Sequence, residues 1–251
     1  MGSHLGAIGF PPDHPLNDAL HQLMTHASHL GANAEGRVDV YGLDDPSGAR
    51  TTVTLEDRRV TCLTPGFAPG TRLDVRLGAL APNDCAFERP LIVEVLDAQG
   101  GMQYPLAVTI DDLGISEPMI QAGERAVIEV VAIADQLSRF PDVAAYRASG
   151  TPMAVASLIP SGLFAPGVVE ADALPVRSVA LISGTVMAAE LRTHSLFGHP
   201  FATVVMASLG ADYRVCIDVA DLGGVAAPDL PAVGSIISGE FYLSGRLAAT
   251  G

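Results

Sequence analysis

The chain has 251 residues, a formal net charge of −14, and 49% hydrophobic against 17% charged residues. This is enough apolar material for one large or two small domains, and the mean hydropathy of +0.35 favours a homo-oligomer that buries part of its surface. The acidity argues against nucleic-acid and anionic-membrane partners, because both would be repelled at long range.

Three further features of the composition limit the function. The protein is lysine-free, since all 14 basic residues are arginine, so no lysine can form a Schiff base or hold a phosphate in a P-loop. Neither a transmembrane run nor a signal peptide is recognisable. The cysteines Cys62, Cys85 and Cys216 are widely spaced and form no CxxC pair, which predicts buried thiols in a reducing cytoplasm.

The N-terminal part is predicted to contain one helix. Residues 1–10 are expected to be disordered, because Met1-Gly2-Ser3-His4 resembles a vector-derived remnant. A helix is predicted over residues 11–31, where Pro15 suits the first turn, Gly31 suits a stop, and apolar residues recur at helical spacing.

From Gly36 onward the apolar residues alternate with a period of two. Short strands separated by Pro and Gly turns, including predicted turns at 45–48, 64–66 and 100–101, indicate a β-rich domain over residues 36–148, either a sandwich or a barrel. The run 126–134 reads as a buried strand, but 132–148 is compatible with a strand or with a short helix broken near Pro141.

Residues 149–177 are rich in Pro and Gly, which predicts an irregular connection between two domains or, alternatively, a long excursion packed on one continuous β-structure. The last predicted unit covers residues 178–251. It opens with a long strand that bends at Gly184 and closes with the apolar run 233–246. This is the pattern of a small, strongly bent β-barrel.

Several segments of this unit occur in a recognisable order: Ile182-Ser183-Gly184-Thr185-Val186, Glu190-Leu191-Arg192-Thr193, the stretch 198–207, and the closing Gly239 and Gly245-Arg246-Leu247. Over residues 179–247 they resemble the bacterial single-stranded-DNA-binding proteins. The resemblance implies an OB-like barrel and, as one function, the binding of single-stranded nucleic acid. Only three arginines lie in residues 178–251, however, and such a groove suits a polyanion poorly.

Two sets of residues are candidates for function. His194 and His199 bracket a predicted hairpin, where they are candidates for acid–base catalysis or for a metal pair; the alternative is two solvent-exposed turn histidines. By strand alternation Arg214, Cys216 and Asp218 share one face of the barrel. Together with Arg192 they are the candidate ligand-binding residues. The alternative for Arg214 and Asp218 is that they are surface charges without a ligand.

The sequence therefore predicts an all-β protein with a short N-terminal helix, a β-rich first domain and a C-terminal OB-like barrel. No catalytic motif is complete, so the leading hypothesis is a non-catalytic binding or assembly module for a protein or small-molecule partner. No cofactor and no metal are predicted. The first alternative is an enzyme with a pocket between the β units and His194 or His199 as acid–base group. The second is a single-stranded nucleic-acid binder.

Overall fold

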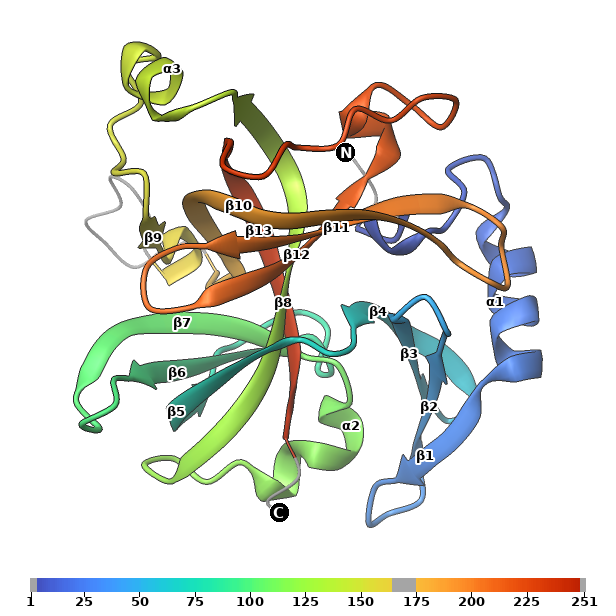
Figure 1. Cartoon of the computed structure of the whole chain (residues 1–251). Helices are drawn as coiled ribbons and strands as arrows, with labels where there is room; N and C mark the ends of the chain where they lie inside the picture. The colour runs from blue at the N-terminus through green and yellow to red at the C-terminus, as the bar shows by residue number, and fades with distance from the viewer. Residues whose placement is uncertain (1–3, 164–174, 249–251) are drawn as a thin grey trace.

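The computed structural model describes residues 4–163 and 175–248, and these ranges form two β-sheets (Figure 1). The predicted all-β class with a short N-terminal helix is confirmed. A four-stranded sheet has the order β1-β2-β3-β4, and a nine-stranded sheet contains β5 to β13. The helices of the described ranges are too short to cross a membrane, and the longest, α1, has 11 residues.

The first sheet consists of β1 (Ser28–Ala32), β2 (Val38–Asp44), β3 (Ala49–Glu56) and β4 (Arg59–Phe67). The second consists of β5 (Thr71–Leu80), β6 (Pro90–Leu96), β7 (Met102–Ile110), β8 (Arg125–Phe140), β9 (Ser157–Ile159), β10 (Val179–Thr193), β11 (Pro200–Ala207), β12 (Asp212–Asp218) and β13 (Ile236–Leu247). The helical elements are η1 (Gly6–Ile8), α1 (Leu16–His26), α2 (Leu113–Ser116), η2 (Glu117–Met119), α3 (Val143–Ala148), η3 (Ser161–Leu163) and η4 (Val219–Leu222).

The N-terminal segment differs from the prediction. Residues 1–3 lie outside the described ranges, but residues 6–10 are buried instead of disordered, with Ile8 at 0% and Phe10 at 5% exposure. The physical reason is that the run Gly6–Phe10 is apolar and packs into a core. The helix predicted over 11–31 begins after Pro15 and ends at His26, because residues 28–32 pair with β2 as a strand.

Most strand and turn predictions in 36–110 agree with the structure, with one exception. The turns at 45–48 and 100–101 are present, but Pro65 lies inside β4, opposite Thr51 of β3. Within the four-stranded sheet β4 is an edge strand. A proline is tolerated there because its missing N–H faces no partner strand.

Two long strands, β8 and β13, organise the nine-stranded sheet. They pair antiparallel from Ile128 and Leu247 at one end to Phe140 and Ile236 at the other. On one side β5, β6 and β7 close a ring with them, because β5 pairs with β8 and β7 pairs with β13. On the other side β10, β11 and β12 close a second ring, because β10 pairs with β13 and β12 pairs with β8.

The two rings are built in the same way. In each, three consecutive antiparallel strands are followed by a short helical segment and then by one of the shared long strands. In the first half, β5 to β8, the third strand β7 pairs in parallel with β13, the long strand of the second half, and Thr109 lies opposite Ser244. In the second half, β10 to β13, the third strand β12 pairs in parallel with β8, the long strand of the first half, and Val215 lies opposite Ala132. The chain therefore contains two structurally equivalent halves that the sequence pattern does not reveal.

The strand pairing crosses the predicted boundary between the two domains. Residues 178–248 supply β10 to β13, but β8, from the predicted first domain, closes their ring. The strand predicted over 126–134 is present and continues to Phe140, and helix α3 follows Pro141 with Asp142 as its N-cap. Of the predicted connection 149–177, residues 157–159 form β9 on the edge of the same sheet, and residues 164–174 lie outside the described ranges. One hydrogen-bonded sheet thus joins the two predicted domains.

Two hydrophobic cores result. The larger fills the rings and takes side chains from β5 to β8 and from β10 to β13. The smaller lies between the outer face of β8, β11 and β12 and the N-terminal elements, and it contains Ile8, Phe10, Leu23, Phe67 and Phe201. The four-stranded sheet and the N-terminal segment therefore cover one outer face of the second ring.

Candidate functional site

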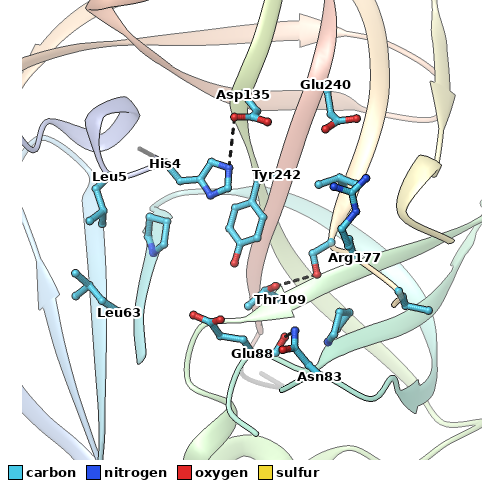
Figure 2. A pocket seen from close by; sticks show the side chains of 15 residues that line it. His4, Leu5, Leu63, Asn83, Glu88, Thr109, Asp135, Arg177, Glu240 and Tyr242 are labelled. Atoms are coloured by element: carbon cyan, nitrogen blue, oxygen red, sulfur yellow. Dashed lines mark hydrogen bonds and ion pairs between the residues drawn. The ribbon is translucent and has the colours of Figure 1, made fainter. Parts of the chain in front are cut away.

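A pocket of about 450 Å³ lies where the N-terminal elements meet the shared β8–β13 pair (Figure 2). We call it the junction pocket. Its wall combines residues 4–5, β4, the loop between β5 and β6, the start of β10, and the outer faces of β8 and β13. The polar side chains that line it are those of His4, Asn83, Glu88, Thr109, Asp135, Arg177, Ser178, Glu240 and Tyr242.

Strand geometry brings two carboxylates to the same end of the pocket. Glu240 and Tyr242 are alternate residues of β13 and therefore share its outer face. On the partner strand β8, Gln136 pairs with Glu240 and Ala134 pairs with Phe241, so Asp135 between them is the extra residue of a β-bulge. A bulge re-aims the side chain of the inserted residue. Figure 2 shows Asp135 and Glu240 on neighbouring strands beyond the Tyr242 ring.

An aromatic pair forms one wall of the pocket. The imidazole of His4 stacks on the ring of Tyr242, with centroids 4.4 Å apart and planes inclined by 9°. The nearest charge is Asp135, whose Oδ1 lies 4.0 Å from His4 Nε2. Burial lowers the pKa of His4, and Asp135 opposes this only in part. The ring is therefore neutral at neutral pH and leaves the neighbouring carboxylate without a full counter-charge.

The floor of the pocket is formed by buried hydroxyls. Thr109 Oγ1 donates a hydrogen bond of 2.8 Å to Ser178 Oγ, which connects β7 to the segment before β10. Burial raises the pKa of Tyr242 well above its ordinary value, so its hydroxyl keeps its proton across the physiological range. Among the described residues, the pocket thus holds the carboxylates of Glu88, Asp135 and Glu240 and one guanidinium, that of Arg177.

Glu88 also belongs to a second cluster beside the pocket. The sulfur atoms of Cys62 and Cys85 lie 3.4 Å apart, and the thiols and the Glu88 carboxylate have ligand atoms within 4.8 Å of one another. Cys62 is buried in β4, whereas Cys85 and Glu88 are half-buried in the loop between β5 and β6. Burial, and after it the Glu88 carboxylate, raises the pKa of Cys62. Widely spaced cysteines are thus brought together by tertiary structure.

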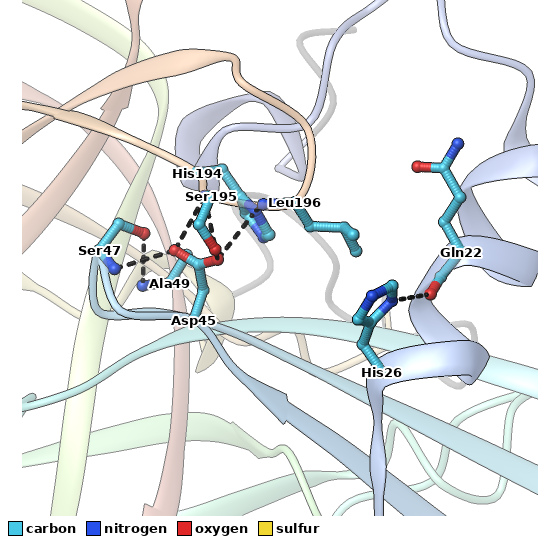
Figure 3. Close-up of polar contacts among 8 residues, drawn as sticks. All are labelled: Gln22, His26, Asp45, Ser47, Ala49, His194, Ser195 and Leu196. Carbon is cyan, nitrogen blue, oxygen red and sulfur yellow. Dashed lines mark hydrogen bonds and ion pairs between the residues drawn. The ribbon is translucent and has the colours of Figure 1, made fainter.

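His194, a candidate acid–base residue, is fully buried in a polar cluster (Figure 3). Its Nδ1 accepts the N–H of Leu196 at 3.2 Å and lies 3.3 Å from Asp45 Oδ2. Asp45 in turn accepts the N–H of Ser47 at 2.9 Å and both the N–H and the hydroxyl of Ser195. Burial alone would raise the pKa of Asp45, but the hydrogen bonds from Ser195 and Ser47 bring it below its ordinary value.

The same burial lowers the pKa of His194, with Asp45 opposing it in part. The neutral ring accepts at Nδ1 and therefore carries its proton on Nε2, which has no hydrogen-bond partner within the described ranges. His199 is half-buried, and its carbonyl accepts the N–H of His194. Neither imidazole lines the junction pocket. A fully buried His194 cannot reach a substrate from solvent.

The predicted ligand face of the barrel is covered. Cys216, predicted as a ligand-binding residue, has 0% exposure and packs in the smaller core, because the N-terminal segment lies on this face. Asp218 caps η4 by accepting the N–H of Ala220. Arg214 is half-buried, and its N–H donates to Thr71 Oγ1.

Arg192 links the second ring to the four-stranded sheet instead of to a groove. Its guanidinium donates to the carbonyl of Ser47 at 3.1 Å and to Glu190 Oε2 at 2.6 Å, and it lies 5.9 Å from the centroid of the Phe67 ring. The structure therefore does not bring the four predicted ligand residues together around an open space.

One further buried charge has a perturbed pKa. Asp111, in the turn after β7, is 5% exposed, and its Oδ2 lies 3.6 Å from Arg50 Nη1. Burial, with a smaller contribution from Asp112, raises the pKa of Asp111 to about 7 in spite of Arg50. Arg50 also pairs with the exposed Asp44 at 2.6 Å. These residues do not line the junction pocket.

Sequence reasoning missed the pocket residues for two reasons. His4 belonged to a segment expected to be disordered, and the bulge at Asp135 depends on how β8 pairs with β13. One signal was present: Glu240 and Tyr242 alternate on a predicted strand. Comparisons with known proteins add no assignment, since no family model, no curated protein and no solved structure matches the chain.

Proposed function

We propose that this protein is a non-catalytic binding module and that the junction pocket holds a compact organic cation. One observation carries the proposal: Asp135 and Glu240 converge on the pocket beside the stacked rings of His4 and Tyr242. Carboxylates next to an aromatic face are the chemistry that recognises ammonium groups.

The charges of the pocket support a cation over an anion. Within the part of the chain that the structure describes, three carboxylates line it against one guanidinium, that of the exposed Arg177, and the chain as a whole carries −14. A positively charged ligand would be attracted at long range and would gain a counter-charge in the pocket. An anionic ligand would meet repulsion from both sources.

The size and apolar lining support a small molecule. The cavity of about 450 Å³ falls within the range of about 300–1,000 Å³ that is usual for ligand pockets. Leu63, Pro65, Pro90 and Val179 supply apolar wall between the charged groups. This combination suits a cation with a methylated or aliphatic body more than a fully hydrated metal ion.

The enzyme alternative receives no support from this pocket, because His194 and His199 lie outside its lining. The single-stranded nucleic-acid alternative is disfavoured by the acidic lining, which would repel a phosphate backbone. Binding without chemistry therefore remains the function that the geometry supports best.

Calorimetric titration with choline and its neutral isostere 3,3-dimethylbutan-1-ol tests the proposal. We expect choline to bind at least about tenfold more tightly than the isostere, a difference of about 1.4 kcal/mol. Glu240→Gln and Asp135→Asn should each weaken choline binding at least about fivefold, whereas Asp13→Asn, an exposed acid outside the pocket, should not. Equal affinity for choline and the isostere, or equal losses in all three variants, would reject the proposal.

We further propose that the protein is a cytoplasmic homo-oligomer. Large apolar side chains remain exposed in the single chain, among them Met187 at 53%, Leu191 at 46% and Val233 at 71%, and self-association would remove such surface from water. Native mass spectrometry of the purified protein is the test, and a single species at 25.9 kDa across micromolar concentrations would reject the oligomer.

A further inference from the structure

We propose that Cys62, Cys85 and Glu88 form a binding site for one zinc-class divalent cation, adjacent to the organic-cation site and sharing Glu88 with it. The two sulfur atoms and a carboxylate oxygen lie within 4.8 Å of one another. Thiolates select zinc and other soft or borderline metals over magnesium and calcium, and carboxylate oxygen is a common additional zinc ligand.

The distances suit a metal ion with little rearrangement. In a tetrahedral zinc site with Zn–S bonds of about 2.3 Å, two sulfur ligands are about 3.8 Å apart. The sulfur atoms of Cys62 and Cys85 are 3.4 Å apart, so a shift of a few tenths of an ångström opens the required space. Glu88 then completes a three-ligand set.

The chain holds these ligands on two supports. Cys62 is fixed in β4, opposite Thr54 of β3. Cys85 and Glu88 lie in a turn in which the N–H of Glu88 donates to the carbonyl of Cys85 at 3.1 Å. Asn83 closes this turn: its Oδ1 accepts the N–H of Cys85, and its Nδ2 donates to the carbonyl of Glu88. The ligand spacing is therefore set by backbone contacts and not only by side-chain rotamers.

The carboxylate favours a metal over a regulatory disulfide. A disulfide would join the two sulfur atoms and would not use the Glu88 carboxylate beside them. A divalent cation would engage both sulfur atoms and the carboxylate at once. Glu88 also lines the junction pocket, so the proposed ion would lie next to that pocket.

Cobalt substitution on the full chain, reduced beforehand and freed of metal with a chelator, tests the site. We expect one equivalent of Co²⁺ to produce a thiolate-to-cobalt charge-transfer band together with intense visible d–d bands of tetrahedral geometry, and one equivalent of Zn²⁺ to abolish them. Cys85→Ser should remove the charge-transfer intensity of one thiolate, and Glu88→Gln should weaken cobalt binding at least about tenfold. Cys216→Ala, which changes the remaining thiol, should leave the spectrum unchanged.

Several results would overturn the site. These are the absence of a charge-transfer band in the reduced protein, a band of undiminished intensity in Cys85→Ser, or a band that depends on Cys216. Cys85 and Glu88 are half-buried, so their variants should fold, and a melting curve verifies this. The test is independent of the proposed function, because Glu240→Gln should affect choline binding alone and Cys85→Ser cobalt binding alone.

Discussion

Asp45 and His194 meet across the boundary between the two sheets, with Asp45 Oδ2 3.3 Å from His194 Nδ1. Asp45 lies in the turn between β2 and β3, and His194 directly follows β10. Both side chains are buried, and Ser195 donates its N–H and its hydroxyl to the same carboxylate. This polar cluster connects the four-stranded sheet to the second ring. Because Asp45 accepts several hydrogen bonds, removing its carboxylate lowers the free energy of unfolding.

Replacing Asp45 should therefore destabilise the protein more than replacing an ordinary turn aspartate. Asp45→Ala removes the acceptor of three hydrogen bonds, from the N–H of Ser47 and from the N–H and hydroxyl of Ser195, and we expect a loss of about 3 kcal/mol in the free energy of unfolding. Asp97→Ala is the matched control, since Asp97 accepts only the local N–H groups of Gln99 and Gly101; about 1 kcal/mol is expected there. Urea denaturation at pH 7 measures both, and equal losses would contradict a cross-sheet role.

Asp111 should make the protein less stable as the pH rises. Its folded pKa of about 7 lies above its ordinary value of 3.8, so between these values the unfolded chain releases a proton that the folded chain keeps. The contribution is unchanged below about pH 4, falls between pH 4 and pH 7, and remains unfavourable above pH 7. Asp111→Asn should therefore gain about 2–4 kcal/mol relative to the wild type between pH 4 and pH 8.

The control for this pH profile is Asp44→Asn, since Asp44 pairs with the same Arg50 but has a side chain that is 70% exposed. Its stability difference from the wild type should change by less than about 1 kcal/mol over that range. Urea titrations at a series of pH values provide the comparison. Parallel pH profiles for Asp111→Asn and the wild type would show that Asp111 does not titrate as described.

The N-terminal segment should be part of the folded core. Phe10 is 5% exposed and packs against Phe197, with ring centroids 4.4 Å apart. Phe10→Ala is expected to cost about 3–5 kcal/mol. Leu16→Ala, at a position 56% exposed, should cost less than about 1 kcal/mol. Thermal or urea unfolding distinguishes the two, and similar small effects would mean that the segment does not pack.

Close approach of β8 and β13 should make Gly239 irreplaceable. A Cβ atom there would overlap the carbonyl oxygen of Gln136, which belongs to the backbone and cannot rotate away. We expect Gly239→Ala to lose about 3 kcal/mol or more, or to lose its cooperative transition. At Gly31 the nearest atom to a new Cβ is 3.5 Å away on the side chain of Ile115, so Gly31→Ala should be nearly neutral. A Gly239→Ala variant as stable as the wild type would refute the close approach.

The sequence located individual strands well because alternation is a local property. Period-two patterns marked β2 to β7, and the apolar run 126–134 marked β8, because each strand buries one or both of its faces. The same local reasoning failed where hydrogen-bond pairing between strands determines the secondary structure. Gly31 reads as a helix stop, yet it lies in β1 because β2 offers partners, and Pro65 reads as a turn, yet it fits an edge strand.

For the candidate functional sites, the difference between what local alternation predicts and what packing determines is larger. Alternation correctly placed Arg214, Cys216 and Asp218 along one face of a strand, but it could not show that the N-terminal segment covers that face. It likewise could not show that Cys62 and Cys85 meet. Burial and contact between distant segments depend on how the whole chain packs, and no spacing within one strand encodes them.

The sequence by itself therefore determined the all-β class, the positions of most strands and the acidic, lysine-free chemistry of the chain, because these follow from composition and local periodicity. Only the tertiary structure decided that β8 and β13 are shared by two rings, that a bulge turns Asp135 toward Glu240, and that both lie beside His4 and Tyr242. These depend on hydrogen-bond pairing and burial between segments far apart in the chain, and the candidate site exists only where those segments meet.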